Sequence, residues 1–455
     1  MTAPNWLHSA RRIAPLAWPV LVGQVAVLAF STIDTVLVAR ASALDLAALA
    51  IGGSAYISIF IGLMGMVLAV GPIAGQLFGA GRRAEAGAQL HQAFWLALAV
   101  SVPGCTLLLY PQPFLALAQS PPEVAAKVRD YLGALAFALP PALLFTAFRG
   151  FNTAVSRPKI VMGLQLAGLG FKLPLSAALV FGLDAGPLHI PAYGAAGCAY
   201  ATVIVMYGQL FAAVLLIQRD PFYRSFDLRG RWHRPHRPSL YGLARLGVPM
   251  GSAMMIEVTG FTFMALFISR IGALPVAGHQ LAANLVALMF MVPLSIGYAT
   301  SALVAQRIGA GDRADVRRLG WHGVQIATAI AAVLGAAVFM LRRPILHLYT
   351  DNPEVVAAAL PLLAWVVWFH VADAVQAIAS FVLRAHLIAV VPLIVNTVAV
   401  WGVGMGGGYW LAFDPGAPTA LQGAQGFWAA ATLGLVVSAL GLAGYMGWMF
   451  HQRAR

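Results

Sequence analysis

Apolar segments long enough to cross a lipid bilayer recur along the whole chain. A membrane-spanning helix needs about 20 predominantly apolar residues, and helices satisfy their own backbone hydrogen bonds in lipid. Of the 455 residues, 60% are hydrophobic and 9% are charged, against about 25% charged in a soluble domain. Twelve segments have the required length: 13–38, 48–72, 89–110, 131–148, 160–182, 194–217, 244–269, 276–303, 319–341, 357–383, 387–412 and 423–449. The sequence therefore predicts an all-α polytopic membrane protein with about twelve transmembrane helices.

The second half of the chain repeats the first at a constant spacing. The stretch Gln76–Glu85 (QLFGAGRRAE) aligns with Gln306–Asp315 (QRIGAGDRAD) at an offset of 230 residues. Further pairs keep this offset or differ from it by one: Pro19 with Pro249, Arg40 with Arg270, and Pro122 with Pro353. Such repeats are typical of transporters whose halves bind substrate near the midplane and rock against each other. We therefore expect two pseudo-symmetric six-helix bundles: an N-terminal lobe 1–217, a cytoplasmic basic linker 218–243 and a C-terminal lobe 244–455.

Lysine and arginine residues are unequally distributed between the segments that connect the spans. If the N-terminus is cytoplasmic, 21 of the 28 lie on the cytoplasmic side, six lie on the opposite side, and Lys172 lies within a span. The positive-inside rule then predicts that both termini are cytoplasmic, in what we expect to be the inner membrane. The residues behind the net charge of +13 accordingly orient the protein in the membrane and lie near the lipid headgroups. We therefore expect no nucleic-acid partner.

Three acidic residues lie inside predicted spans: Asp34, Glu257 and Asp373. A charge at bilayer depth costs at least about 2.5–3.5 kcal/mol, so it usually faces a cavity and marks function. Such a carboxyl group can exchange a proton or Na⁺ for a cationic compound, since both compete for one negative charge. On a helix the face of Glu257 also carries four adaptable apolar side chains, which would suit a large lipophilic cation: Met250, Met254, Phe261 and Met264. The alternative for each acid is a structural hydrogen bond between helices, with the methionines as ordinary packing.

Several short motifs follow one another along both halves of the chain. They are DTVLVA (34–39), DLAA (45–48), QLFGAG (76–81), GAAGCAYAT (194–202), IEVT (256–259), AGHQLAAN (277–284), FMVPLSIG (290–297) and DAVQ (373–376). With these motifs the chain resembles the MATE (multidrug and toxic compound extrusion) family, in its NorM-like branch, over nearly its whole length. The resemblance implies export of structurally varied, mostly cationic organic compounds, driven by inward flow of Na⁺ or H⁺.

Several further residues are candidates for supporting the site. Helical spacing places His370 and Gln376 on the face of Asp373, where His370 either relays protons or packs and hydrogen-bonds. Gln280 is another candidate for supporting the site. His279 and Asn284 match the family pattern, and could equally serve as packing or backbone ties. We expect no cofactor besides the coupling ion.

The fifth span departs from the family pattern. Where many members carry asparagines, this chain reads FKLPLS (171–176), with Lys172 as the basic residue in mid-span. An unpaired ammonium at this depth is costly, so we hypothesise an ion pair between Lys172 and Asp34. That pair would repel Na⁺ and leave Glu257 and Asp373 as the site for the drug and for the coupling ion, either H⁺ or Na⁺. The absence of an obvious all-oxygen cage favours H⁺.

Other classes of membrane protein are weaker alternatives. A lipid or lipid-linked precursor flippase of a related fold would differ mainly in cargo. A twelve-span facilitator of another fold would also show an internal repeat of six spans, but Asp34 and Glu257 argue against this class. The sequence holds no HExxH motif, no phosphate-binding loop ending in GK[ST] and no paired aspartates of the prenyl-transfer kind, so we expect neither an enzyme nor an ATP-driven pump. A passive channel fits the composition, but mid-span acids in a repeated architecture fit alternating access better. We expect cationic drugs or dyes and the bilayer as partners, and a monomer.

Overall fold

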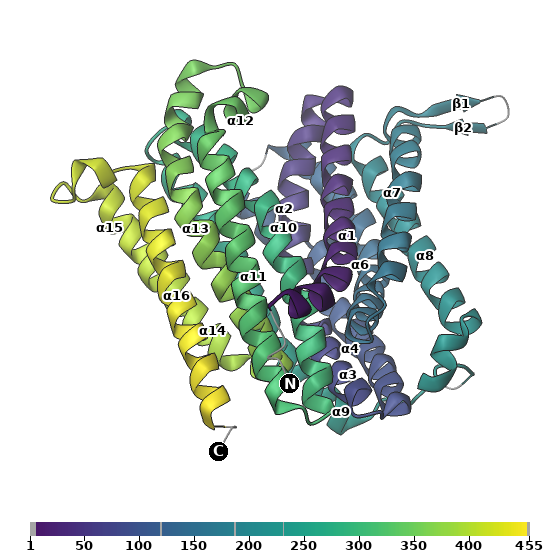
Figure 1. Ribbon diagram of the computed structural model, residues 1–455. Coiled ribbons are helices and arrows are strands. Elements are labelled where there is room, and N and C mark those ends of the chain that lie inside the picture. The colour runs from purple at the N-terminus through teal and green to yellow at the C-terminus, as the bar shows by residue number, and fades with distance from the viewer. Residues whose placement is uncertain (1–5, 119–120, 186–187, 231, 453–455) are drawn as a thin grey trace. The chain divides into compact units, whose positions relative to one another are not determined.

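The computed structural model describes residues 6–118, 121–185, 188–230 and 232–452. Within these ranges twelve helical segments are long and apolar enough to cross a membrane, as the sequence predicts (Figure 1). The predicted linker 218–243 is described except for Arg231, and the C-terminal Arg453 and Arg455 also lie outside the described residues. The chain forms two compact units: an N-terminal unit of residues 22–251, and a C-terminal unit that combines residues 6–21 with 252–452.

The N-terminal unit is built around α6 (Pro122–Ala154). This helix packs against α2 (Ala43–Val67), α4 (Arg83–Leu109) and α8 (Ala195–Arg219), and α7 (Pro158–Phe181) packs against α8. The remaining elements are the last part of α1 (Trp6–Ala41), α3 (Val70–Gly79), α5 (Gln112–Ala118), strands β1 (Leu183–Ala185) and β2 (Leu188–Ile190), the 3-10 helix η1 (Pro221–Phe226) and the first part of α9 (Arg237–Ser269). The two strands form an antiparallel hairpin between α7 and α8 (Figure 1).

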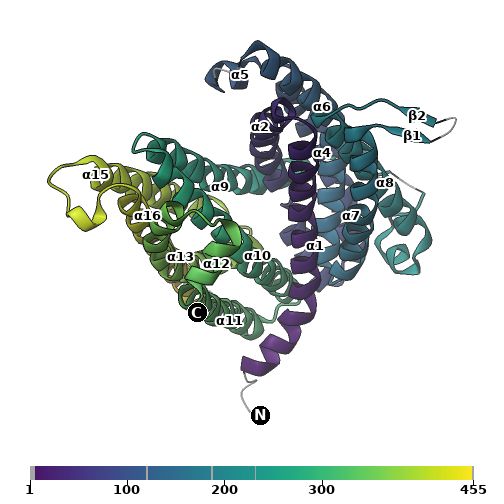
Figure 2. The ribbon, with the colours of Figure 1, turned by 90° about the horizontal axis from the view of Figure 1, so that it is seen from above.

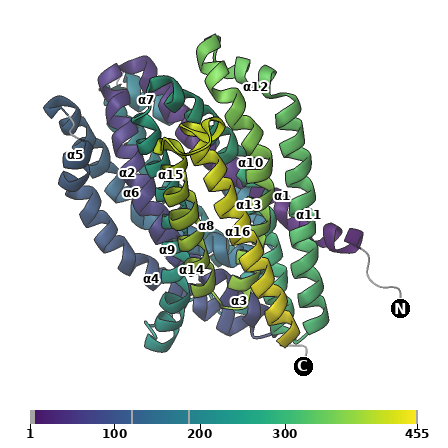
Figure 3. The same ribbon diagram turned by 90° about the vertical axis from the view of Figure 1, so that its left-hand side faces the viewer.

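The C-terminal unit is built around α13 (Pro353–Ala385). It packs against α10 (Ala273–Gly309), α11 (Arg313–Met340) and α16 (Ala424–Gln452), which Figure 2 shows from their ends. The eleventh span consists of three consecutive helices that run along α16 (Figure 3): α14 (Val390–Thr397), the π-helix η2 (Val398–Gly406) and α15 (Gly407–Phe413). The short helices α12 (Arg342–Tyr349) and η3 (Thr419–Leu421) complete the unit.

The internal repeat is visible in the packing of both units. Helices α6 and α13 each contain 33 residues and begin at Pro122 and Pro353. The neighbours of α6 are α2, α4 and α8, and their counterparts in the repeat, α10, α11 and α16, are the neighbours of α13. Each copy of the GAG turn holds a glycine in the left-handed region, Gly81 at φ 76° and Gly311 at φ 75°, where a side chain would be strained. The repeat predicted from the sequence is therefore present in the structure.

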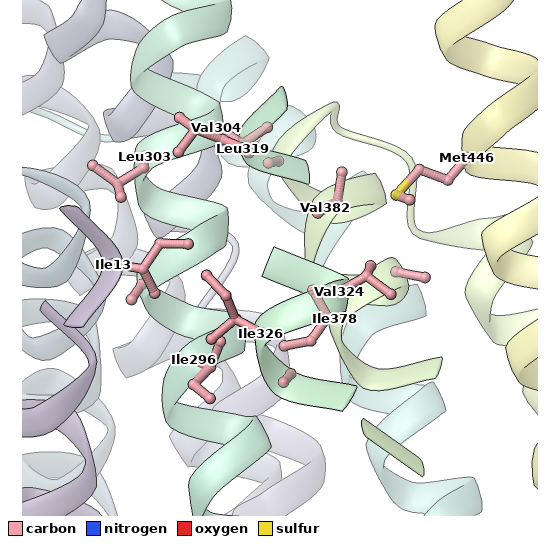
Figure 4. Packing of buried hydrophobic residues seen from close by; sticks show 14 of the residues in the cluster. Ile13, Ile296, Leu303, Val304, Leu319, Val324, Ile326, Ile378, Val382 and Met446 are labelled. Atoms are coloured by element: carbon pink, nitrogen blue, oxygen red, sulfur yellow. The ribbon is translucent and has the colours of Figure 1, made fainter. Parts of the chain in front are cut away.

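Helices α1 and α9 are each divided between the two units. The boundaries fall after Leu21 in α1 and after Gly251 in α9, so they are 230 residues apart and match the repeat. The first part of α1 belongs to the C-terminal unit because Ile13 packs into a core of residues from α10, α11 and α13 (Figure 4). The predicted lobes, 1–217 and 244–455, follow the order of the spans instead, and their role as moving bodies stays a prediction.

Most helices extend beyond the apolar segments predicted from the sequence. The predicted span 131–148, for example, is part of a helix that begins at Pro122 and ends at Ala154. Hydropathy marks only the residues that suit the hydrocarbon core, whereas a helix continues until its capping or turn residues. The hairpin, η1, α5, α12 and the π-helix were not predicted, because each depends on local geometry rather than on hydropathy.

The linker between the sixth and seventh spans is folded against the N-terminal unit. Arg157 Nη1 lies 2.6 Å from Asp220 Oδ2, and the buried Tyr223 donates a hydrogen bond of 2.6 Å to Asn152 Oδ1. The backbone N–H of Phe222 and the Arg157 guanidinium both lower the pKa of Asp220, and burial raises the pKa of Tyr223 to about 12. The connection is therefore held in one geometry by several side chains.

Candidate functional site

Glu257 and Asp373 share one amide partner in the C-terminal unit. Gln376 Nε2 lies 3.5 Å from Glu257 Oε1 and 3.4 Å from Asp373 Oδ1. Glu257 lies on α9 and is partly buried, whereas Asp373 and Gln376 lie one turn apart on α13 and are buried. The structure therefore brings together two of the three acids predicted from the sequence, with Gln376 between them.

Hydrogen bonds from buried polar residues hold Glu257 and Gln376 in place. Asn396 Nδ2 donates to Glu257 Oε1 over 2.9 Å, and Ser438 Oγ donates to Asn396 Oδ1 over 2.7 Å. Because Ser438 occupies the amide oxygen, the amide nitrogen of Asn396 faces the carboxylate. On the other side, Ser380 Oγ donates to Gln376 Oε1 over 3.3 Å. Asn396, Ser438 and Ser380 come from α14, α16 and α13, and all three are buried.

Sequence analysis missed Asn396 and Ser438. The signal for Asn396 was an amide inside the apolar segment 387–412, which is costly in lipid unless it is hydrogen-bonded. Ser438 gave no comparable signal, because a serine in a membrane helix can bond to the backbone of its own preceding turn. Its role depends on the position of α16 beside α14.

One buried cation balances part of the negative charge of this site. Arg384 lies near the end of α13, is 5% exposed, and its charge acts on Glu257. Its guanidinium also lies over the ring of Phe381, 5.1 Å from the centroid. With Glu257 and Asp373 both ionised, this cluster carries one net negative charge, which a proton or another cation can neutralise.

Only part of the apolar lining expected beside Glu257 is free to contact a lipophilic cation. Phe261 packs edge-on against Phe369, with 5.9 Å between ring centroids, and Met264 is buried in the same apolar core. Met254 is partly exposed, whereas Met250 belongs to the N-terminal unit. Of the four side chains that share the face of Glu257 by helical spacing, Phe261 and Met264 therefore pack in the core of the C-terminal unit, and Met250 is buried in the N-terminal unit.

The supporting candidates from α10 do not contact the two acids in the structure. Gln280 and Asn284 are exposed. Asn284 Oδ1 instead accepts a hydrogen bond of 3.2 Å from Tyr349 on α12. His370 is fully buried on α13, one turn before Asp373.

The predicted ion pair of the N-terminal unit is present. Lys172 Nζ lies 3.0 Å from Asp34 Oδ2 and donates to Thr202 Oγ1 over 2.6 Å. Ser176 Oγ donates to Asp34 Oδ1 over 3.4 Å. The Lys172 side chain is 1% exposed and that of Asp34 is 11% exposed, and the ring of Phe30 lies 5.5 Å from the ammonium. Asp34 thus has a permanent counter-ion supplied by the chain itself.

Metal ligands are sparse in the described part of the chain. No group of three or more His, Cys, Asp and Glu side chains is placed there to hold a metal ion. A Na⁺ ion at Glu257 and Asp373 would therefore need additional amide, hydroxyl or backbone oxygens.

The chain is similar to known transporters over nearly its whole length. The MatE family model matches residues 19–178 and 249–410. The "Probable multidrug resistance protein NorM" of Aromatoleum aromaticum is 37% identical over 442 residues, covering 97% of this chain and 94% of that protein. The multidrug resistance protein NorM of Vibrio cholerae is 32% identical over 448 residues, covering 98% and 97%. The crystal structure of the eukaryotic MATE transporter AtDTX14 superimposes with a TM-score of 0.87 at 20% identity, covering 99% of this chain and all of that one. These relatives are transporters rather than enzymes, and with its twelve apolar helices the chain belongs to the MATE family of multi-pass membrane transporters.

Proposed function

We propose that the chain is a secondary active multidrug efflux transporter that exports cationic lipophilic compounds in exchange for inward H⁺ or Na⁺. The observation that carries this proposal is the pair of carboxyl groups, Glu257 and Asp373, that share Gln376 in the C-terminal unit. The relatives are named as multidrug resistance proteins, which supports efflux of several drugs.

The charge of the site supports an exchange mechanism. With both acids ionised and one arginine nearby, the site attracts an organic cation. Protonation of either acid removes that attraction and releases the compound. Alternating access of the two lobes would expose the same acids to each side in turn. One charge that moves through 100 mV supplies about 2.3 kcal/mol to this cycle.

The hydrogen-bond donors around the acids favour H⁺ over Na⁺. Asn396 and Gln376 present amide N–H groups to the carboxylates, whereas Na⁺ as a hard cation prefers oxygen ligands. The orientation of Asn396 is fixed by Ser438. A proton needs only the carboxylate oxygen that these donors leave free.

The ion pair of the N-terminal unit supports a site confined to the C-terminal unit. Lys172 already neutralises Asp34 at 3.0 Å, so a second cation gains little there. The coupling ion and the drug are therefore assigned to Glu257 and Asp373.

The distribution of arginines supports an inner-membrane protein with both termini in the cytoplasm. At the predicted cytoplasmic ends of α1, α10 and α11, the carboxylate of Asp315 contacts Arg12 at 2.9 Å, Arg307 at 3.0 Å and Arg318 at 3.8 Å. Three cations around one acid leave a positive excess of the kind that the positive-inside rule describes. We propose that the chain acts as a monomer, since each acid has its partners within one chain.

The test uses purified protein in liposomes loaded with ethidium. A pH gradient and a Na⁺ gradient are imposed separately, on the wild type and on Glu257→Gln and Asp373→Asn. We expect efflux driven by the pH gradient alone, and its loss in both variants. Glu354→Gln is the matched control, because Glu354 lies in the first turn of α13 and is exposed.

Efflux driven by Na⁺ alone would overturn the choice of H⁺. No gradient-driven efflux of ethidium under either condition would reject the drug antiporter and favour the flippase alternative. Full activity of both acid variants would reject Glu257 and Asp373 as the exchange site.

A further inference from the structure

Among the buried side chains of the C-terminal unit whose polar atoms no described protein group satisfies, three are aromatic rings with at most 1% exposure. The unsatisfied atoms are both ring nitrogens of His370, Nδ1 of His279 and the indole nitrogen of Trp428. The side chains are 0%, 1% and 0% exposed, respectively. Native proteins pair roughly 90% or more of buried polar groups, either with protein or with ordered water. The four nitrogen atoms of these three rings therefore need an explanation.

Ring contacts join His279 to Trp428, and Trp428 to the turn of α13 that carries His370. His279 is in the second turn of α10, and its ring centroid is 5.9 Å from that of Trp428. The Trp428 ring is in turn 5.5 Å from that of Phe369, the residue before His370 on α13. His370 lies three residues before Asp373, so both project from the same face of the helix, about one turn apart.

This order of polar atoms suits a row of water molecules. Each nitrogen can hydrogen-bond to water, and a buried water needs two to four polar partners. The apolar core around the row, which includes Phe369 and Trp428, would keep it narrow. The other titratable groups of this region are Glu257 on α9, which is joined to Asp373 through Gln376, and Arg384 near the end of α13.

We infer that His279, Trp428 and His370 line a buried water file that conducts protons between the outer end of the C-terminal unit and Asp373. The inference rests on the proposed H⁺ exchange. A proton reaches the file from bulk water at the His279 end and is passed along hydrogen-bonded waters to the Asp373 carboxylate. The indole N–H only donates a hydrogen bond, and the two imidazoles orient the waters. The protein thus separates the route of the proton from the route of the drug.

The test measures proton release and drug binding separately. Ethidium is mixed with purified protein in a stopped-flow instrument, and a pH indicator reports the rate of proton release while ethidium fluorescence reports its Kd. We expect His370→Phe to slow proton release at least tenfold while the Kd changes less than twofold. His370→Gln, which restores a hydrogen-bond donor and acceptor, should return the rate to within about threefold of the wild type.

The pair His279→Phe and His279→Gln repeats the test at the other end of the file. His347→Phe is the control, because His347 is an exposed histidine on α12 of the same unit. An unchanged unfolding temperature shows that a slow variant is folded.

Failure of the inference and failure of the proposed function give different results. If the wild type releases no proton when ethidium binds, the proposed H⁺ exchange fails, and the water file fails with it. If the wild type releases protons and both Phe variants do so at the wild-type rate, only the water file is overturned. Equal loss in the Phe and Gln variants would also overturn it, because a row of waters needs only a polar lining.

Discussion

Replacement of Lys172 by Met should destabilise the N-terminal unit more than any exposed charge change. The Lys172 ammonium lies 3.0 Å from Asp34 Oδ2, and its side chain is 1% exposed. At that distance two unit charges attract by about 5.5 kcal/mol with an effective dielectric constant of about 20. Met has nearly the same volume, so the variant leaves no large cavity. Removal of one partner of a buried ion pair costs about 3–5 kcal/mol, and we expect a loss in that range.

The chain offers a matched control for this change. Lys127 Nζ lies 3.1 Å from Asp45 Oδ1 in the same unit, but the Lys127 side chain is 39% exposed. The Asp45 side chain is buried, but water reaches the Lys127 ammonium and screens the pair, and Asp45 keeps its hydrogen bond from the Ala195 backbone N–H. Lys127→Met should therefore cost only about 0–1 kcal/mol. The two variants compare the same residue types at nearly the same distance and with similarly buried carboxylates, so the difference isolates the effect of burying the lysine.

The assay is a titration with SDS in mixed micelles, with the free energy of unfolding measured for each variant. The double variant Asp34→Asn with Lys172→Met removes both charges and should recover most of the loss, which a double-mutant cycle measures directly. If Lys172→Met costs no more than Lys127→Met, burial does not determine the strength of this pair. If the double variant is as unstable as Lys172→Met alone, the loss does not come from an uncompensated Asp34 charge.

Three further changes test other parts of the structure. Asn396→Leu removes the hydrogen bond of 2.9 Å that Asn396 donates to Glu257. A hydrogen bond to a charged group contributes about 1.5–3 kcal/mol, so we expect the rate of drug-coupled exchange in liposomes to fall about 10- to 100-fold. If the variant exchanged at the wild-type rate, Asn396 would be excluded from the site. Asp220→Asn keeps the side-chain oxygen that caps the backbone but loses the charge that faces Arg157. Because the pKa of Asp220 is lowered in the folded state, the wild type should be more stable than the variant at pH 7, and this difference should shrink only below about pH 4. A stability difference that persists at lower pH would contradict this. Gly87→Ala places a Cβ against the backbone carbonyl oxygen of Phe226, the last residue of η1. Limited proteolysis should then cleave the linker faster, and unchanged cleavage would show that the linker does not need this close approach.

The two units share a fold but differ in their chemistry. At the repeat offsets of 230 and 231, the counterparts of Glu257 and Asp373 are Val27 and Ala142. The N-terminal unit instead holds an acid that is neutralised within the chain. The repeat therefore preserves the packing of helices around α6 and α13, while the buried charges that would exchange ions belong to one copy.

The sequence alone determined the spans, the repeat and one ion pair. The spans can be predicted from hydropathy because every lipid-facing residue meets the same apolar solvent. The contribution of each residue is therefore local, and the contributions add up along a segment. The GAG turns follow from glycine, which alone adopts their backbone geometry without strain. The pair of Lys172 and Asp34 could be predicted because a buried ammonium needs a carboxylate, and Asp34 is the acid within the spans of that half.

Only the tertiary structure decided how the acids of the C-terminal unit are held. Helical periodicity places residues on a face but does not say which helix that face meets. It could not show that Gln376 links Glu257 to Asp373, that Asn396 and Ser438 orient Glu257, or that Gln280 and Asn284 do not contact the acids. Those contacts join residues up to about 140 positions apart, and they depend on the packing of α14 and α16. Hydropathy in a membrane does not encode this packing, because lipid and protein neighbours are equally apolar.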